Sequence, residues 1–504
     1  MSGMLFSVSR PCIAVALLLL AACATVEPQR DRAAESAHTP ATMDVWSELP
    51  DIERHDRLIP LNIGSDALQW RLRALRAATD SIDLQTFIWK DDGVGLALVR
   101  EVVAAAERGV RVRVLLDDSF LIHADPGLQA LSRHPNISYR IYNPAAQRSG
   151  NMLTRELKNL NDFSRINHRM HNKLLVVDGR VAIIGGRNQA DEYFGYEASH
   201  NFRDFELVVS GPFMAQLEAV FDLYWNDPWS LAIEDLVAAD EGPDFASIQA
   251  WLQDNALDHR GLAESTAQDW SGLFADAFTA DLELLVDMPA DANPIEDMPV
   301  QLAGALIERI DTVERDLILV AAYFIPTPAL TNAIERATER GVRVRVFTNS
   351  LGSNNHVSAH AAYAGHRPAL LKAGAELYEL RPDAQSRELY LDVAATESLL
   401  GLHEKGAVFD DCCLFVGSAN LDPRSLRLNT EVGLLIDSPG LNAKVRRLLE
   451  VDLEPQNAWR VTLDSNGAIE WLGEQGAQSH TPPASFYLRA ESWFFGLLPI
   501  EGQM

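Results

Sequence analysis

The sequence predicts an α/β fold made of two tandem copies of one domain, each a mixed sheet flanked by helices. Two observations support this prediction. The octapeptide ERGVRVRV occurs at residues 107–114 and again at residues 339–346, an offset of 232 positions. In both halves, short β-branched apolar runs also alternate with longer helical patterns, which is typical of a sheet covered by helices on both faces.

Each half places the same predicted elements in the same order: helix, strand, helix and strand. In the first half they span residues 68–78, 82–88, 95–108 and 110–116, and in the second half residues 302–310, 317–324, 329–340 and 342–347. Between the halves, the segment 234–297 holds sixteen acidic residues and a single basic residue, Arg260. We predict that it is an acidic linker with short helices.

The duplication sets the predicted domain boundaries. The first domain spans residues 61–233 and the second residues 298–460, with a tether and lead-in at 23–60 and a C-terminal extension at 461–504. The extension ends in a strongly apolar run at 493–500 that begins with Trp and two Phe residues. Because such side chains suit the boundary of a bilayer, this tail is expected either to face a membrane or to pack against the body.

The N-terminus, residues 1–22, is predicted to be a lipoprotein signal peptide. Its apolar run, residues 13–20, is too short to span a bilayer as a mature helix. The sequence LAAC at residues 20–23 resembles a bacterial lipobox, which implies cleavage before Cys23 and lipidation of that cysteine. Ala24 follows in place of an Asp, which implies the outer membrane. The expected location is the bacterial periplasm, with a lipid anchor to the membrane; an ordinary cleaved signal is the alternative.

The net charge bears on the class of partner. Seventy-one acidic residues against 43 basic residues give a formal charge of −28 at pH 7. Since proteins gain most of their affinity for nucleic acids from basic side chains on phosphates, we expect no nucleic-acid partner. The acidic linker supplies more than half of this imbalance, which leaves room for a locally basic site elsewhere.

The four cysteines are too few and too unevenly spaced to form a disulfide framework. They are Cys12, Cys23, Cys412 and Cys413. If the adjacent pair lies on a strand, its side chains point to opposite faces and a disulfide between them is strained. We therefore predict that Cys412 and Cys413 are two small buried residues without a disulfide.

A polar motif on a strand recurs in both halves at the offset of the octapeptide. The two copies are His171, Lys173 and Asp178 in the first half, and His403, Lys405 and Asp410 in the second. On a strand, positions i and i+2 point the same way, so each histidine projects beside its lysine. Each aspartate follows at the strand end, next to a predicted turn, and support of turn and strand is its favoured role.

Two further pairs complete the predicted site. After each motif a second strand returns to a glycine-containing segment that ends in Asn188 or Asn420, whose amides can donate to a phosphate. Asp204 and Glu431 begin matching final strands, 33 and 28 residues past His171 and His403. These acids are the candidates that orient the histidines through the second ring nitrogen.

This combination of residues suits the chemistry of a phosphodiester. One imidazole can attack phosphorus while the other protonates the departing alkoxide. Lysines and amides can hold the non-bridging oxygens as charge builds, so no metal or other cofactor is expected. His356, His360 and His366 are interpreted as loop or surface residues rather than metal ligands.

The paired H-x-K-x4-D motifs resemble those of the phospholipase D superfamily, and the resemblance extends over nearly all of the mature chain. It is closest to the C-type bacterial cardiolipin synthases. The supporting runs are FIW at 87–89, RMHNK at 169–173, GGRN at 185–188, DEYF at 191–194, TNSL at 348–351, DPRS at 422–425 and LPIE at 498–501. This resemblance implies two tandem phospholipase D-like α/β domains with one shared active site, in which both motifs are catalytic.

The resemblance also implies an activity. In such enzymes one histidine forms a phosphatidyl-histidine, and the other protonates the leaving alcohol and then activates the acceptor. Family tendency makes His171 the nucleophile and His403 the acid and base. For a cardiolipin synthase, the acceptor is phosphatidylglycerol and the donor is phosphatidylglycerol or phosphatidylethanolamine. A phospholipase D-type hydrolase that yields phosphatidic acid is the main alternative; a metal-independent nuclease and a non-catalytic scaffold are disfavoured.

Overall fold

The structure is a computed structural model that describes most of the chain. The described residues are 26–36, 46, 49, 54–148, 152–237, 242–257, 269–289, 301–392, 397–482 and 485–496. The predicted signal peptide at 1–22, Cys23 and the last residues, 497–504, lie outside this part. Within the described residues, no helix combines the length and the apolar character needed to cross a bilayer.

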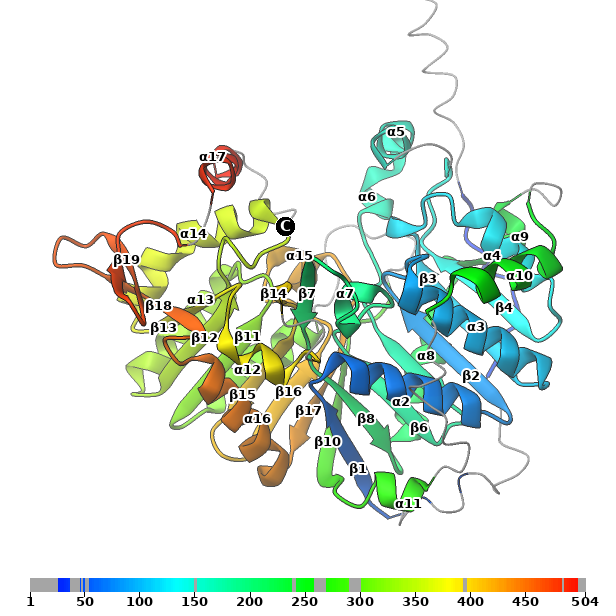
Figure 1. Cartoon of the computed structure of the whole chain (residues 1–504), viewed down its shortest axis with the longest axis horizontal. Helices are drawn as coiled ribbons and strands as arrows, with labels where there is room; N and C mark the ends of the chain where they lie inside the picture. Colours follow the sequence, from blue (N-terminus) through cyan, green and yellow to red (C-terminus); the bar gives the residue numbers. More distant parts are fainter. Residues whose placement is uncertain are drawn as a thin grey trace, which may run out of the picture.

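The first half folds as a mixed sheet with helices on both faces (Figure 1). Its strands, in spatial order, are β9 (Ser230–Ala232), β4 (Ile137–Tyr142), β3 (Arg111–Asp117), β2 (Ser81–Thr86), β5 (Leu174–Val177), β6 (Val181–Gly185), β8 (Glu206–Ser210) and β1 (Asp56–Leu61). Its helices are α2 (Gly64–Ala77), α3 (Gly93–Glu107), α4 (Asp125–Ser132), α5 (Met152–Lys158), α6 (Phe163–Ile166), α7 (Asp191–Phe194), α8 (Met214–Trp225) and α9 (Ile233–Leu236).

The second half repeats this arrangement. Its strands, in spatial order, are β10 (Phe278–Val286), β17 (Val432–Asp437), β16 (Cys413–Gly417), β15 (Lys405–Phe409), β11 (Asp316–Ala321), β12 (Arg343–Asn349), β13 (Glu376–Leu380), β18 (Ala458–Leu463), β19 (Ile469–Gly473) and β20 (Gly476–Gln478). Its helices are α12 (Gln301–Thr312), α13 (Pro328–Glu339), α14 (Val357–Lys372), α15 (Pro423–Arg427), α16 (Pro439–Asp452) and α17 (Phe486–Phe495). The predicted α/β duplication is therefore confirmed.

The repeated octapeptide forms the same structure twice. Its first residues end helices α3 and α13, and Gly109 and Gly341 follow in the left-handed region, with φ of 98° and 87°. Only glycine enters that region freely, which explains the sharp reversal into β3 and β12. The arginines Arg113 and Arg345 on these strands are buried and paired with carboxylates, Asp83 and Asp316 respectively. These buried ion pairs of the repeat therefore belong to the packed interior of each half.

The two halves are joined more closely than the predicted domain boundaries imply. Strand β10 lies inside the segment 234–297, which we had predicted to be a linker with short helices, and it pairs with β1 on one side and β17 on the other. Within the described ranges, it thereby joins the two sheets into one of eighteen strands. The short helices α10 (Phe245–Asn255) and α11 (Trp270–Leu273) do occur there. The prediction of a linker with short helices was therefore wrong for the residues of β10. Along most of this strand, exposed residues alternate with half-buried ones, and acidic residues occupy some of the exposed positions.

The sheet also extends beyond the predicted domain ends at residues 61 and 460. Strand β1 begins at Asp56, inside the predicted lead-in, and strands β18 to β20 run on to Gln478, inside the predicted extension. A second, two-stranded sheet of β7 (His200–Arg203) and β14 (Leu399–Leu402) crosses between the halves, with Arg203 opposite Leu402. Both connections hold the halves against each other at the site described below.

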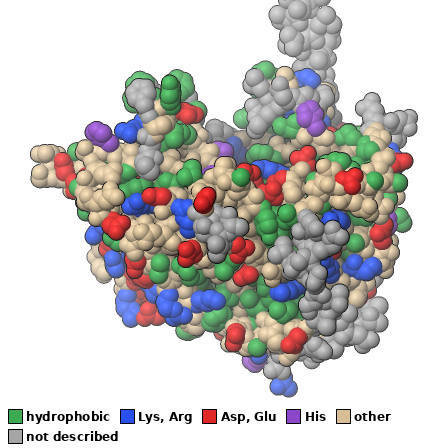
Figure 2. Space-filling model, viewed as in Figure 1, with side chains coloured by type: hydrophobic (Ala, Val, Ile, Leu, Met, Phe, Trp, Pro, Cys, Tyr) green, Lys and Arg blue, Asp and Glu red, His purple; other side chains and the backbone are tan. Residues whose placement is uncertain are grey.

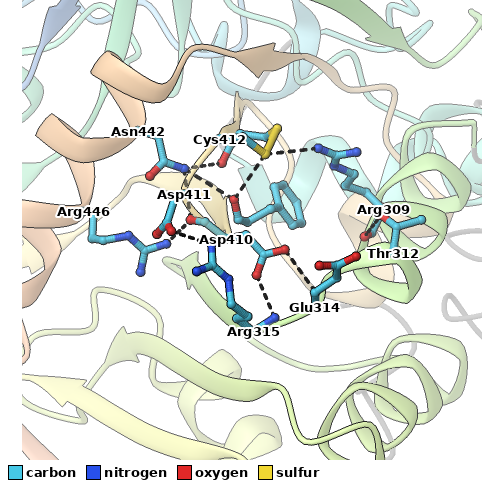
Figure 3. Close-up of a disulfide and its surroundings, with 11 residues drawn as sticks. Arg309, Thr312, Glu314, Arg315, Asp410, Asp411, Cys412, Asn442 and Arg446 are labelled. Carbon is cyan, nitrogen blue, oxygen red and sulfur yellow. Dashed lines mark hydrogen bonds and ion pairs between the residues drawn. A yellow bond between two sulfur atoms is a disulfide. The ribbon is translucent and has the colours of Figure 1, made fainter.

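The cysteines of the second half differ from the prediction, because Cys412 and Cys413 form a disulfide with each other (Figure 3). Only if both residues lay on one strand would their side chains diverge. Instead Cys412 lies in the turn between β15 and β16, and only Cys413 begins the strand. The turn lets the two sulfur atoms approach. Asn442 braces it by donating to the carbonyl of Cys413 at 2.8 Å.

Candidate active site

Both motif histidines lie where the two halves meet, and each is held by the backbone of the other half. The backbone N–H of His171 donates to the carbonyl of Thr430, and that of His403 donates to the carbonyl of Arg203, both at 2.9 Å. Each side chain is buried, with 7% and 6% of its surface exposed. The two motifs therefore form one shared site.

The orienting acids are exchanged between the halves. His171 Nδ1 lies 2.9 Å from Glu431 Oε2, and His403 Nδ1 lies 2.6 Å from Asp204 Oδ2. The structure thus brings both predicted acids to a histidine, but our pairing of each acid with the histidine of its own half was wrong. Sequence distance suggested that pairing, whereas the final strand of each half begins beside the motif histidine of the other half.

This geometry fixes the histidine tautomers. A carboxylate that accepts from Nδ1–H leaves Nε2 as the basic nitrogen in each ring. Burial lowers the pKa of His171 to about 4, with Glu431 opposing the shift, and burial and Lys405 lower the pKa of His403 to about 3, with Asp204 opposing the shift. Both rings are therefore neutral at pH 7 before an anion binds, which suits nucleophilic attack.

The two motif lysines supply buried positive charge beside the rings. Lys173 Nζ donates to the carbonyl of His171 at 2.6 Å, and Lys405 Nζ donates to that of His403. Burial lowers the pKa of Lys173 to about 7 and that of Lys405 to about 8; the charge of Lys405 lowers the former further, while Asp204 and Glu431 oppose both shifts. A bound phosphate would offset the repulsion between these lysines, so the site favours an anion.

The two asparagines face the same site through short segments after β6 and β16. Asn188 Oδ1 accepts from the backbone N–H of Ile88 at 3.1 Å, and Asn420 Oδ1 accepts from that of Tyr323 at 3.4 Å. Since the amide oxygens are engaged, the NH₂ groups are the ends that can donate to a phosphate. The NH₂ of Asn188 also reaches the Tyr193 hydroxyl. The ring of Tyr193 packs on the ring of His403.

The motif aspartates lie apart from the reacting groups. Asp178 accepts from the backbone N–H groups of Thr79, Asp80 and Ser81, and Asp410 accepts from those of residues 314–316 (Figure 3). Each sits after the end of its strand opposite to the histidine and fastens the hairpin to the start of β2 or β11. This placement agrees with support of turn and strand, and not with the catalytic role that the family motif implies.

A buried ion network behind His403 was not predicted from the sequence. Arg203 pairs with Glu404 and, at 2.5 Å, with Asp452, and its guanidinium lies over the ring of Tyr390. These partners come from the other half, so the network positions Asp204, the next residue along the chain. The polar run 201–204 at the start of a final strand was the available signal, but its partners are remote in sequence.

A cavity of about 400 Å³ opens beside His171. It lies between the halves, and its mouth carries two half-exposed aromatic residues, Phe120 and Phe163, each 45% exposed. Polar lining residues include Arg169, Asn420 and Arg424. The site therefore joins a buried centre of histidines, lysines and asparagines to an opening that is partly apolar, which suits an amphipathic substrate.

The three histidines of α14 and its start do not gather. His356 packs on the Tyr323 ring, and His360 Nε2 lies 2.8 Å from Arg367 Nη2, within a buried cluster that includes Glu379. Among the described residues no three His, Cys, Asp or Glu side chains are grouped as ligands of a metal ion.

Comparison with known families decides the identity. A family model described as "Cardiolipin synthase, PLD-like domain" matches residues 72–225 and 306–453, more than half of the chain. The chain belongs to the phospholipase D-like family. It is an enzyme of that family, and the two matched regions correspond to the two halves that share the site.

Individual relatives agree with this assignment. The chain is 34% identical to "Cardiolipin synthase C" of Escherichia coli strain K12, over 88% of this chain and 95% of that protein. It is 30% identical to an uncharacterized protein of Helicobacter pylori strain J99, over 90% of both chains. The crystal structure of phosphatidylserine synthase from Haemophilus influenzae Rd KW20 superimposes with a TM-score of 0.56 at 14% identity, covering 92% of this chain and all of that one, which shows a common fold.

Proposed function

We propose that this enzyme forms cardiolipin by transferring a phosphatidyl group from phosphatidylglycerol or phosphatidylethanolamine to the glycerol head group of phosphatidylglycerol. The exchanged pairs of His171 with Glu431 and His403 with Asp204, both beside buried lysines, are the observation that carries the proposal. The relationship to a protein named cardiolipin synthase C supports the choice of lipid.

The proposed first step forms a phosphohistidine. His171 Nε2 attacks phosphorus, the bond from phosphorus to the head-group oxygen breaks, and His403 gives its Nε2 proton to that oxygen. In the second step His403 takes a proton from the acceptor hydroxyl, whose oxygen attacks phosphorus and releases His171. The lysines and amides hold the non-bridging oxygens throughout.

The proton on His403 requires a bound substrate. Its pKa of about 3 belongs to a site in which burial and Lys405 disfavour the imidazolium. The negative charge of a phosphodiester offsets that of the lysine and raises the pKa of His403 toward neutrality. Substrate binding therefore supplies the protonation state that the leaving group needs.

Product analysis tests the proposed activity. Purified protein is incubated with labelled phosphatidylglycerol, with and without phosphatidylethanolamine, and the lipids are separated. We expect labelled cardiolipin and free glycerol or ethanolamine. Phosphatidic acid without cardiolipin would contradict the transfer and support the hydrolase instead.

The assignment of the two histidines has its own test. After rapid quenching, His403→Ala is expected to accumulate labelled phosphatidyl on His171, because the first step retains its nucleophile while acid and base assistance is lost. His171→Ala should accumulate none. A labelled peptide containing residue 403 in the wild-type protein would reverse the assignment.

We also propose that the mature chain is attached to a bacterial membrane, facing the periplasm, through a lipid on Cys23. The lipobox-like run before Cys23 supports this location. Cys23→Ala is expected to remain unprocessed and to incorporate no labelled fatty acid. Normal processing and membrane partition of this variant would contradict the anchor.

A further inference from the structure

The proposed catalytic groups occur in both halves. Two arginines that line the cavity beside them have no arginine at the equivalent position of the other half. By the offset of the repeat, Arg169 corresponds to Gly401, and Arg424 corresponds to Glu192. Both arginines line the cavity next to His171, and they come from opposite halves. A single phosphodiester needs only the duplicated histidines, lysines and asparagines, so this pair calls for a separate explanation.

The two arginines lie near each other. Arg169 Nη1 donates to the carbonyl of Asn143 at 3.2 Å and lies 3.8 Å from Asp117 Oδ1, while Arg424 Nη2 donates to Asn167 Oδ1 at 2.8 Å. Burial lowers the pKa of Arg424, the charge of Asp422 opposes this shift, and the charge of Arg169 adds to it. Two cations close together in a half-buried cavity repel each other, and an anion between them relieves that cost.

Arg155 is the third arginine that lines the cavity. Arg155 forms an ion pair with Asp118, which also binds Arg148. Asp125 is a second acid for Arg148, so two arginines meet two carboxylates in that cluster. Arg169 and Arg424 line the cavity together with His171, and their nearby carboxylates, Asp117 and Asp422, do not pair with them as closely as Asp118 pairs with Arg155.

The equivalent space beside His403 is filled. Gly401 has no room for a side chain, because a Cβ there would collide with the His200 ring. The ring of Phe202 packs on His403 itself, and Glu192 is engaged by Lys90. Among the residues that the structure describes, it is therefore the His171 side of the site that has room for a second charged group.

We propose that Arg169 and Arg424 form a second phosphate-binding subsite, which holds the phosphodiester of the acceptor lipid while its glycerol hydroxyl reaches the reacting phosphorus. This inference rests on the proposed function, and it assigns the acceptor class as an anionic glycerophospholipid. In such an acceptor a three-carbon bridge separates the hydroxyl from the phosphate, so the two phosphates lie side by side in one site. Arginine suits this role because its planar fork binds phosphate oxygens in pairs.

The test compares acceptors at a fixed labelled donor, phosphatidylethanolamine. The quantity measured is the ratio of kcat/KM for glycerol 3-phosphate to that for glycerol, which differ by the phosphate. We expect Arg169→Gln and Arg424→Gln each to lower this ratio at least tenfold, and Arg424→Lys to restore part of it. Arg427→Gln, an exposed arginine on the same helix, is the matched control and should leave the ratio unchanged. An unchanged ratio in both folded Gln variants would overturn the subsite.

A second measurement separates this inference from the proposed function. If the protein only hydrolyses lipid, the proposed transfer fails, and the subsite is then tested by inhibition of hydrolysis. Glycerol 3-phosphate should inhibit the wild type at least tenfold more strongly than the two Gln variants, and equal inhibition would refute the subsite. Inorganic phosphate is the further arm: weaker inhibition than by glycerol 3-phosphate supports an acceptor site, whereas equal potency would overturn the assignment to a glycerophosphate.

Discussion

At the scale of single residues, the exchanged histidine–carboxylate pairs make the activity depend on both halves at once. We expect Glu431→Gln and Asp204→Asn each to lower kcat roughly 100-fold or more, because an amide no longer fixes the Nδ1–H tautomer or stabilises the charged ring. The measurement is steady-state transfer to phosphatidylglycerol with folded protein. Glu470→Gln on β19 is the control. Values of kcat within about threefold of wild type for both variants would remove the acids from the mechanism.

The lysines give a prediction about pH. Their pKa values of about 7 and about 8 lie below the ordinary lysine value, so both ammonium groups are charged at lower pH and neutral at higher pH in the free enzyme. As pH rises through this window, kcat/KM should fall because phosphate binding weakens. A bound anion raises both pKa values, so kcat should persist to higher pH. A kcat/KM that stays flat from about pH 6 to about pH 9.5 would argue against phosphate binding by lysines with lowered pKa values.

At the scale of elements, the motif aspartates act as fasteners between a hairpin and its neighbouring strand. Asp178 is fully buried and accepts from three backbone N–H groups, the Thr79 hydroxyl and the Trp46 indole. We expect Asp178→Ala to destabilise the fold by about 3 kcal/mol, because buried donors lose their acceptor. Asp410→Ala should cost about 1 kcal/mol, since its donors at Glu314 and Arg315 are exposed and water replaces the carboxylate.

Denaturant unfolding of both aspartate variants measures this difference, with activity followed in parallel. Activity per folded molecule should stay close to wild type in Asp410→Ala. A loss of kcat comparable to that of the histidine variants, in protein that remains folded, would return the aspartates to the reaction. Equal destabilisation in the two variants would contradict the role of burial.

The elements also show what the sequence could and could not predict. The octapeptide and the offset of 232 located both sheets and the two histidine–lysine motifs, because strand periodicity and helix ends are local. The partner of each carboxylate was mispredicted, since Glu431 meets His171 only where the two halves pack together. Strand β10 and the disulfide at Cys412 were mispredicted for a related reason. Strand pairing and turn geometry depend on neighbours in space, which a local sequence pattern does not identify.

At the scale of the whole molecule, apolar side chains project from the side on which the cavity residues gather. Helices α5 and α6 and helix α17 rise from the same side of the body (Figure 1), and hydrophobic side chains gather on the α17 projection (Figure 2). Trp493 and Phe494 on α17 are 68% and 54% exposed, although the helix also reaches α14 through Ser492, which lies 3.5 Å from His360. The tail therefore packs on the body with one face and leaves aromatic residues outside.

These exposed aromatic residues lead to a prediction about membrane contact. In a protein that begins at Ala24, and therefore carries neither the signal peptide nor Cys23, Trp493→Ser with Phe494→Ser should weaken binding to phosphatidylglycerol vesicles roughly tenfold, because two interfacial side chains no longer leave water. Transfer with dispersed short-chain lipid should change less than about twofold, since neither residue lines the cavity. Val451→Ser on α16, an exposed apolar residue that does not line the cavity, is the matched control. Unchanged vesicle binding in the double variant would place the membrane contact elsewhere. Helices α5 and α6, which contribute Arg155 and Phe163 to the cavity lining, would then be the remaining projection to test, because the proposed phospholipid substrate has to pass from a bilayer into that cavity.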